Sequence, residues 1–551
     1  MREEGDQPPE ETTTRMRRVV HTLKSLPPYP VLFAISPVLS LYAQNTDQVT
    51  VQELAIGLGI TVLPTILIYC LVLGIAHDGR RAALAAAVFL VFYSLYGTIS
   101  SGLKMLPIRW ITPDTDRRYV LPAWTLLYLL YSLYVLRTPR RLNGLTAMLN
   151  ASAGFLLAIT AGLIALQSVG SEASIRRRES PGSSLPVAAI EGVTRQVPDV
   201  YYIVLDGYAR SDVLRALYSY DNERFLTELK HLGFVIADDS RSNYCQSILS
   251  LASSLNMDYI SELLPQAKPN GRSRSPLVRL LRDSSVMRRF RDHGFRAIAF
   301  ETGYSLTDMT TADAFLRPAM SGLTQGPFVD RILAATPIPV LLQTDRMSGY
   351  DLHRKRLEFT FAQLSNLGVA AGRKFVFAHI VAPHPPFVYG AHGEPMEWPW
   401  PFSLNDGSHL IRPGGMTRDT FVTAYRDQLH YVNSLTLDTL KSIIEQAEIP
   451  PVIVLQADHG PGSLLNNHDA EDTNMGERLS ILNAYLIPGE AGIDASAIYD
   501  SITPVNTFRI IMNGLFGEEL PLLPDRSYYS TGDRPYDFVD VTERAVQEAG
   551  E

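Results

Sequence analysis

The chain has 551 residues, of which 46% are hydrophobic and 19% are charged, and its formal net charge is -8. This length exceeds that of an ordinary single domain. The acidic balance argues against a nucleic-acid-binding protein, whose binding domain is usually basic. The shortage of charged residues falls almost wholly before residue 171. We therefore expect an N-terminal membrane region followed by a soluble region.

Five stretches near the N-terminus contain no Asp, Glu, Lys or Arg and are close to the length of about 20 residues that a membrane-spanning helix needs. They are Leu26–Ala43, Leu54–Ala76, Ala82–Leu103, Tyr119–Leu136 and Leu142–Gly170. A cleaved signal peptide is an alternative for the first stretch, which four prolines interrupt, but it does not explain the other four. We predict a cytoplasmic tail over residues 1–25 and five transmembrane helices over residues 26–170.

The distribution of Lys and Arg predicts which way these helices face. The N-terminal tail and the loops on its side of the membrane, which contain Arg80, Arg81 and Arg137, hold more basic residues than the opposite loops. This places the tail in the cytoplasm. With an odd number of spans, everything after residue 171 is then extracytoplasmic, on a protein of the plasma (inner) membrane.

Residues 171–197 are polar, contain Pro and Gly, and are interpreted as a linker stem. From residue 198, short apolar runs alternate with amphipathic helical patterns such as Asn222–Leu232 and Thr420–Gln446. The strand-like runs are 200–205, 295–300, 375–381, 451–457 and 481–487. This alternation predicts an α/β domain over 198–535, with a mostly parallel central sheet covered by helices on both faces and a C-terminal tail over 536–551.

Acidic and imidazole side chains follow three of these strand-like runs. Asp206 follows the first run, His384 follows the third, and Asp458, His459 and Gly460 follow the fourth. Function in such sheets gathers at the carboxyl ends of strands. Asp and neutral His are ligands for cations such as Zn2+ or Mn2+. The alternative for Asp206 is that it caps the helix that follows it.

The stretch 241–257 holds many small hydroxyl residues followed by an apolar helical spacing. Ser247 lies where that helix begins, near the positive end of the helix dipole, and an attacking oxyanion or a phosphate would be favoured there. The sequence leaves open whether Ser247 is such a nucleophile or only caps the helix.

Together these motifs resemble the alkaline phosphatase superfamily, over roughly residues 198–532, and within it the sulfatase-like membrane enzymes such as lipoteichoic acid synthases and phosphoethanolamine transferases. The resemblance implies that Asp206, Ser247, Asp458 and His459 hold one divalent metal ion. It implies that Ser247 is the nucleophile and that His384 and His468 act on the substrate, whereas His379 is interpreted as a buried structural residue. Two departures stand out: Asp206 replaces the Glu of those transferases, and Cys245 lacks the following Pro and Arg that formylglycine sulfatases need.

The resemblance therefore implies a hydrolase or transferase that acts on phosphate or sulfate esters through a covalent intermediate on Ser247. The expected ion is Zn2+ or Mn2+, with Mg2+ or Ca2+ as alternatives. The membrane anchor points to the lipid bilayer as a partner and to a phospholipid head group or an envelope glycan as substrate. Trp398 and Trp400 lie in a Pro-rich loop that either contacts lipid, covers the site or simply packs on the surface.

Two other classes of protein compete with this interpretation. One is a catalytically inactive sulfatase-like domain that serves as a binding or assembly module of the cell envelope. The other is a transporter with an extra domain. The transporter is disfavoured because the five apolar stretches contain no charged residue.

Overall fold

A computed structural model describes residues 27–43, 49, 51–104, 116–138, 142–176, 197–318, 327–341, 348–369, 372–400, 402–412 and 415–549. The chain divides into two compact units. The first comprises Met1–Ala189 together with Met320–Arg346, and the second comprises Ile190–Ala319 together with Met347–Glu551. The sequence analysis placed residues 320–346 in the catalytic domain, whereas this division joins them to the N-terminal helices.

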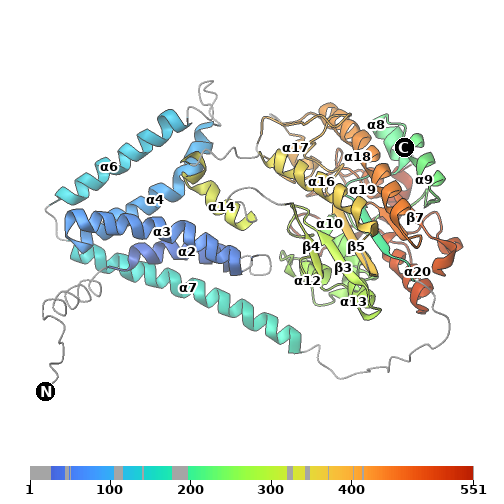
Figure 1. The fold of residues 1–551 in the computed structure, drawn as a ribbon, viewed down its shortest axis with the longest axis horizontal. Helices are drawn as coiled ribbons and strands as arrows, with labels where there is room; N and C mark the ends of the chain where they lie inside the picture. Colours follow the sequence, from blue (N-terminus) through green and yellow to red (C-terminus); the bar gives the residue numbers. More distant parts are fainter. Residues whose placement is uncertain are drawn as a thin grey trace, which may run out of the picture. The chain divides into compact units, whose positions relative to one another are not determined.

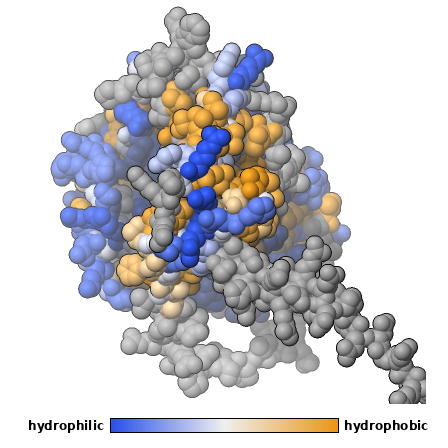
Figure 2. Space-filling view, turned by 90° about the vertical axis from the view of Figure 1, so that its left-hand side faces the viewer, coloured by the Kyte–Doolittle hydropathy of each residue, from blue (hydrophilic) through white to orange (hydrophobic). Residues whose placement is uncertain are grey.

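The first unit is helical. Its elements are α2 (Tyr29–Ala43), α3 (Val51–Ala76), α4 (Gly79–Lys104), η1 (Asp116–Val120), α6 (Leu121–Arg137), α7 (Asn143–Arg176), α14 (Pro327–Ala335) and α15 (Ile338–Leu341). Four helical stretches in the described residues are long and apolar enough to cross a membrane: Val51–Ala76, Gly79–Ser100, Arg118–Arg137 and Asn143–Ala165. They match the second to fifth predicted spans. Many of their apolar side chains are exposed, such as Leu126 and Leu130 (57% each), and Figure 2 shows hydrophobic residues exposed on one face. An exposed apolar surface of this kind is suited to contact with the lipid of a membrane.

The first predicted span forms a shorter helix than expected. Helix α2 has 15 residues and contains Pro37, so it rises only about 22 Å, less than the roughly 30 Å of a bilayer core. Pro27 and Pro28 precede the helix, and proline disfavours helical backbone in the residue before it. The described residues thus confirm four helices of spanning length and not five.

Helix α14 belongs to the segment that follows strand β4 (Ala314–Leu316), yet it packs against α3 and α4. Phe328, Val329, Ile332 and Leu333 form a buried cluster there with Val38 of α2. Two glycines allow α14 to pack closely against α3 and α4. A Cβ atom on Gly57 would lie 2.7 Å from Ile332 Cδ1, and one on Gly97 would lie 1.8 Å from the carbonyl oxygen of Ala334.

The second unit contains a seven-stranded sheet in the order β2-β7-β6-β1-β5-β3-β4. The pairs among β6, β1, β5, β3 and β4 are parallel, whereas β7 pairs antiparallel with both β6 and β2. The remaining strand bounds are β1 (Val200–Leu205), β2 (Val235–Ile236), β3 (Arg296–Phe300), β5 (Lys374–Ile380), β6 (Val452–Gln456) and β7 (Asn483–Leu486). All five predicted strands are present, in a mixed sheet.

Helices cover both faces of this sheet (Figure 1). One core contains apolar residues of α10 (Ser247–Ser254), α12 (Ser275–Arg282), α13 (Ser285–Asp292) and α20 (Pro504–Phe516). The other contains those of α8 (Ser211–Tyr218), α9 (Glu223–His231), α16 (Gly349–Asn366) and α18 (Arg418–Gln446). The central strands are buried on both sides, as their continuous apolar sequences lead one to expect.

Smaller elements complete this unit. They are α11 (Ile260–Leu263), η2 (Leu367–Val369), α17 (Gly407–Leu410), α19 (Met475–Leu479), η3 (Gly489–Ala491), η4 (Ala495–Ala497), β8 (Tyr528–Tyr529), β9 (Val539–Asp540) and α21 (Thr542–Glu548). Helix α21 lies in the stretch that the sequence analysis set apart as a tail. Its Ala545 is fully buried in a cluster with Met475 and Leu479 of α19.

Candidate metal and active site

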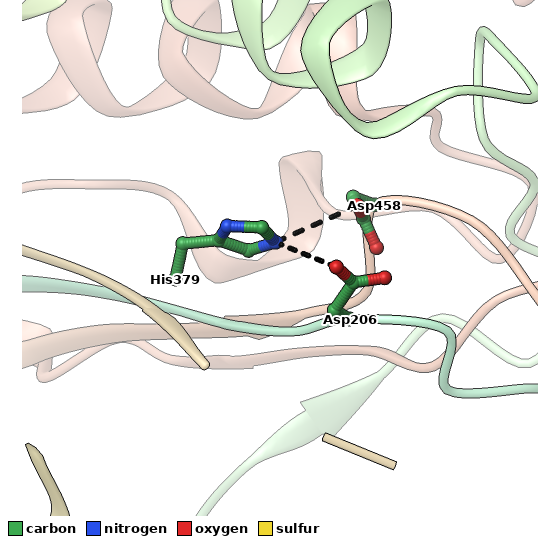
Figure 3. Close-up of side chains that lie close together, drawn as sticks. All are labelled: Asp206, His379 and Asp458. Carbon is green, nitrogen blue, oxygen red and sulfur yellow. Dashed lines mark ion pairs between the residues drawn. The ribbon is translucent and has the colours of Figure 1, made fainter. Parts of the chain in front are cut away.

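Three potential metal ligands meet at the carboxyl ends of three adjacent strands. Asp206 follows β1, His379 is the penultimate residue of β5, and Asp458 comes two residues after β6. His379 Nε2 lies 3.2 Å from Asp206 Oδ2 and 3.6 Å from Asp458 Oδ2 (Figure 3). All three side chains are buried, and one ligand atom from each lies within 4.8 Å of the others. The sequence analysis interpreted His379 as structural, but it lies between the two aspartates.

The donor atoms of this cluster suit a cation. Asp206 Oδ1, His379 Nε2 and Asp458 Oδ2 are buried and have no hydrogen-bond partner among the described residues. A buried carboxylate oxygen that accepts no hydrogen bond is costly, and a divalent cation bound by two carboxylates and one imidazole would offset that cost. We conclude that the donor set fits a divalent metal ion.

The pKa shifts of His379 and Asp458 also favour a bound cation. Burial lowers the pKa of His379, but the two neighbouring carboxylates outweigh it and raise that pKa to about 9. Burial raises the pKa of Asp458, but His459 and His379 outweigh it and leave that pKa below its usual range. A proton on His379 Nε2 and a cation between the carboxylates would compete for one place. Metal binding would therefore release a proton.

Ser247 and His459 adjoin this cluster. Ser247 Oγ lies 3.0 Å from His459 Nε2, which in turn lies 3.6 Å from Asp206 Oδ1 and 3.5 Å from Asp458 Oδ2. His459 Nδ1 lies 2.9 Å from the carbonyl oxygen of Gly460, an acceptor, so Nδ1 carries a proton. Burial and Arg478 lower the pKa of His459 and favour the neutral ring. Its Nε2 therefore presents a lone pair to the serine hydroxyl or to a metal.

The geometry at the start of α10 tests the interpretation of Ser247 as a helix cap. The residue that caps the helix is Gln246, and it makes no side-chain capping hydrogen bond. Ser247 is the first residue of the helix, and its hydroxyl faces His459. Ser247 therefore does not act as the N-cap, and its oxygen lies near the positive end of the helix dipole.

A cavity of 310 Å³ opens onto these residues. It brings together Asp206, Ser247 and His459 with the two other predicted histidines, His384 and His468. His384 Nε2 lies 3.9 Å from Asp406 Oδ1, and its ring centroid lies 6.0 Å from that of His459. His468 is exposed. The five predicted residues Asp206, Ser247, His384, His459 and His468 thus share one cavity, which Asp458 adjoins.

Cys245 is placed differently from Ser247. It is buried in a cluster with Met475, Leu479 and Tyr529 and is not among the residues that line the cavity. Burial raises the pKa of its thiol, which disfavours the reactive thiolate.

Two arginines that the sequence analysis did not single out complete the site. Arg478 is buried and donates to Asp406 Oδ2 at 2.7 Å, to the carbonyl of Cys245 at 2.7 Å and to that of Gly460 at 3.1 Å. It thus ties the chain before the serine to the chain after His459. Burial raises the pKa of Asp406, but Arg478 and His384 outweigh it, so this carboxyl stays ionised. Arg274 Nη2 donates to Gln246 Oε1 at 3.0 Å and adds a cation to the cavity wall.

No protein-family model matches the chain, and no curated protein matches its sequence. Solved structures that it resembles include the C-terminal periplasmic domain of EcEptC from Escherichia coli, with a TM-score of 0.40 and 11% identity over 63% of this chain and 93% of that one. Another is the integral membrane protein lipooligosaccharide phosphoethanolamine transferase A from Neisseria meningitidis, with a TM-score of 0.35 and 12% identity over 89% and 96%. A putative sulfatase from Bacteroides thetaiotaomicron has a TM-score of 0.37 and 13% identity over 62% and 75%.

Phosphoethanolamine transferases and sulfatases are the kinds of protein that the motifs of this sequence resemble, and both are named among these structures. At such identities and TM-scores the similarities carry no inference about what this chain does. Its function follows from the residues of the site.

Proposed function

We propose that this protein is a membrane-anchored, metal-dependent hydrolase or transferase of phosphate or sulfate esters, with Ser247 as its nucleophile. The observation that carries the proposal is the buried cluster of Asp206, His379 and Asp458, whose orphaned donor atoms lie beside the paired Ser247 and His459. In a purely structural cluster we expect buried polar atoms to be hydrogen-bonded, whereas these three have no hydrogen-bond partner among the described residues, and Ser247 lines the cavity beside them.

The residues that would hold the ion are Asp206, His379 and Asp458, with His459 and the Ser247 oxygen near enough to join them. A divalent cation bound there would act as a Lewis acid, which stabilises negative charge on oxygen and lowers the pKa of a hydroxyl. This adds His379 to the ligand set that the sequence resemblance implies.

Side chains of the protein carry out the remaining steps of the reaction. Ser247 passes its proton to the neutral Nε2 of His459, 3.0 Å away, and its oxygen attacks the phosphorus or sulfur atom, so that the bond to the leaving oxygen breaks and a seryl ester forms. Arg274 faces the anionic ester across the cavity, while His384, held beside the ionised Asp406, is placed to protonate the leaving oxygen. Water or an acceptor hydroxyl then attacks the seryl ester, which restores Ser247.

The proposed substrate lies at a membrane, because four helices of spanning length belong to the same chain. A phospholipid head group or an envelope glycan carries the required ester. We further propose that α2 crosses the membrane as a fifth span, its shortfall in length being offset by local thinning of the bilayer, which puts the catalytic unit outside the cytoplasm. An alkaline phosphatase or green fluorescent protein fused after residue 200 tests this: phosphatase activity without fluorescence is expected, and the opposite result refutes the topology.

The covalent intermediate provides the test of the chemistry. The full-length protein in detergent is incubated with Mn2+ or Zn2+ and, in turn, with phosphatidylglycerol, phosphatidylethanolamine and a sulfated glycan, and its mass is measured. We expect a phosphoryl, phospho-head-group or sulfuryl adduct that peptide mapping assigns to Ser247 and that the variant Ser247→Ala lacks.

An adduct on another residue would refute Ser247 as the nucleophile. Metal binding without any adduct or turnover on these substrates would favour the alternative, an inactive domain that serves as a binding module.

A further inference from the structure

A second cavity lies in the same unit and shares no lining residue with the first. Its volume is 330 Å³, within the range of small-molecule sites. One wall is the loop after His384, which supplies Phe387, Tyr389, Gly390, Met396 and Trp398. The opposite wall is the N-terminal part of α18, which supplies Asp419, Thr420, Thr423, Ala424 and Asp427.

The aromatic wall is held in place by contacts of its own. Trp398 Nε1 donates to the carbonyl of Phe387 at 2.8 Å, and the indole stacks on Trp400 with ring centroids 5.4 Å apart and planes 13° apart. The Tyr389 hydroxyl donates to the carbonyl of Arg354. Phe387 and Tyr389 are buried, so the half-buried Trp398, with one face on Trp400, is the aromatic side chain of this wall that is most open to a ligand.

The opposite wall is acidic. Asp419, Thr423 and Asp427 follow one another at intervals of four residues and therefore lie on one face of α18. Neither carboxylate forms an ion pair or hydrogen bond with any residue in the described part of the chain, and Asp427 is half-buried. No Lys or Arg is among the residues that line the cavity, although Arg418 and Arg426 adjoin the two aspartates in sequence.

We propose that this cavity binds an organic ammonium group. The unpaired carboxylates offset a positive charge, and the Trp398 ring attracts it through cation–π interaction, which is strongest for Trp. A quaternary or primary ammonium on a short alkyl stem fits both walls and this volume. A neutral or anionic ligand would leave the carboxylates unpaired or repelled. Such a group occurs both in zwitterionic lipid head groups and in soluble amino alcohols. The proposal is independent of the metal and of Ser247.

Choline is the probe that tests this site. Calorimetric titration of the full-length protein in a maltoside detergent should show choline binding, whereas its uncharged isostere 3,3-dimethylbutan-1-ol should bind much more weakly. We expect Asp427→Asn to weaken choline binding about tenfold and Trp398→Leu by a similar factor. Asp438→Asn, an exposed carboxylate on the same helix outside the cavity, should change nothing. Equal melting temperatures of the variants exclude misfolding.

The same titration distinguishes the source of the ammonium group. If nanodiscs of phosphatidylcholine displace choline and those of phosphatidylglycerol do not, the natural ligand is a lipid head group. If neither displaces it, the ligand is a soluble amino alcohol, and ethanolamine in place of choline shows whether a primary amine suffices. No binding at ~100 mM of either amine, equal binding of the neutral isostere, or unchanged binding in folded Asp427→Asn would each overturn the proposal.

Discussion

Replacing Asp458 with Asn tests whether this residue is a metal ligand or a structural carboxylate. Asp458 Oδ1 accepts hydrogen bonds from the backbone N–H groups of Gly207 at 3.2 Å and His459 at 2.9 Å, whereas its Oδ2 has no partner among the described residues. An asparagine retains the first oxygen and replaces the second with an NH2 group. We therefore expect the fold to survive and only the negative charge offered to the cation to be lost.

The magnitude follows from linkage between binding and folding. A cation at 100 times its dissociation constant stabilises the folded wild-type protein by about 2.7 kcal/mol. If loss of an anionic ligand weakens binding about a hundredfold, the same concentration stabilises the variant by only about 0.4 kcal/mol. For a unit of this size the difference corresponds to about 5 °C in melting temperature.

The assay is thermal unfolding of the detergent-solubilised protein in chelator and in saturating Mn2+ or Zn2+. In chelator, Asp458→Asn should be somewhat less stable than the wild type, because His459 and His379 hold the pKa of this carboxyl below its usual range and its charge therefore stabilises the metal-free fold at neutral pH. With metal, only the wild type should gain stability. Asp438→Asn, on the surface of α18, should follow the wild type in both conditions. A variant that is destabilised equally in both conditions would show a structural role, and an undiminished response to metal would refute the ligand assignment.

Three further predictions follow. Ser247→Ala should lose at least about a thousandfold in turnover and Cys245→Ser should keep most of it, and the reverse would refute the nucleophile. Burial raises the pKa of Asp308 from 3.8 to about 6, so its contribution to stability is lost as pH rises from about 4 to about 6, by at most about 3 kcal/mol. Asp308→Asn should therefore be more stable than the wild type at pH 8 but not at pH 4, and equal pH profiles would contradict this. Gly97→Ala should cost about 1–3 kcal/mol because its Cβ meets the α14 backbone, whereas Gly74→Ala, with nothing within 4 Å, should be neutral or stabilising in a melting assay.

Much of the fold could be predicted from local sequence patterns. The five apolar runs of the second unit are strands because each is short, rich in apolar or β-branched residues, and bounded by turns. Helix α18 was predicted from Thr420 to Gln446 and extends from Arg418 to Gln446, with Thr417 as its N-cap. The long uncharged stretches likewise predict helices of spanning length. Only the first fell short, where prolines delay the start of the helix to Tyr29.

The placement of α14 could not be predicted in this way. The sequence PFVDRILAA has the spacing of an ordinary amphipathic helix, and such spacing says that one face is buried without saying against what. In the structure Phe328 and Ile332 pack beside Gly57 of α3, which lies far away in sequence. Tertiary contacts of this range leave no trace in the local pattern.

His379 shows most clearly what was missing from the site prediction. Val200, Tyr202 and Val204 of β1 contribute to one core, and Tyr201, Ile203 and Leu205 contribute to the other. The same alternation runs along β5 and β6, where Phe377 and Val454 share a core with Tyr202.

Continued past these residues with a period of two, the alternation puts Asp206, His379 and Asp458 on the same face of the sheet. The alternation can be read in the sequence, but the order β6-β1-β5 that makes the three strands neighbours cannot. A histidine near the end of an apolar strand is therefore ambiguous until its neighbours are known. The face it shares with two aspartates, and the absence of a hydrogen-bond partner for its Nε2 among the described residues, are the observations on which its proposed role as a metal ligand rests.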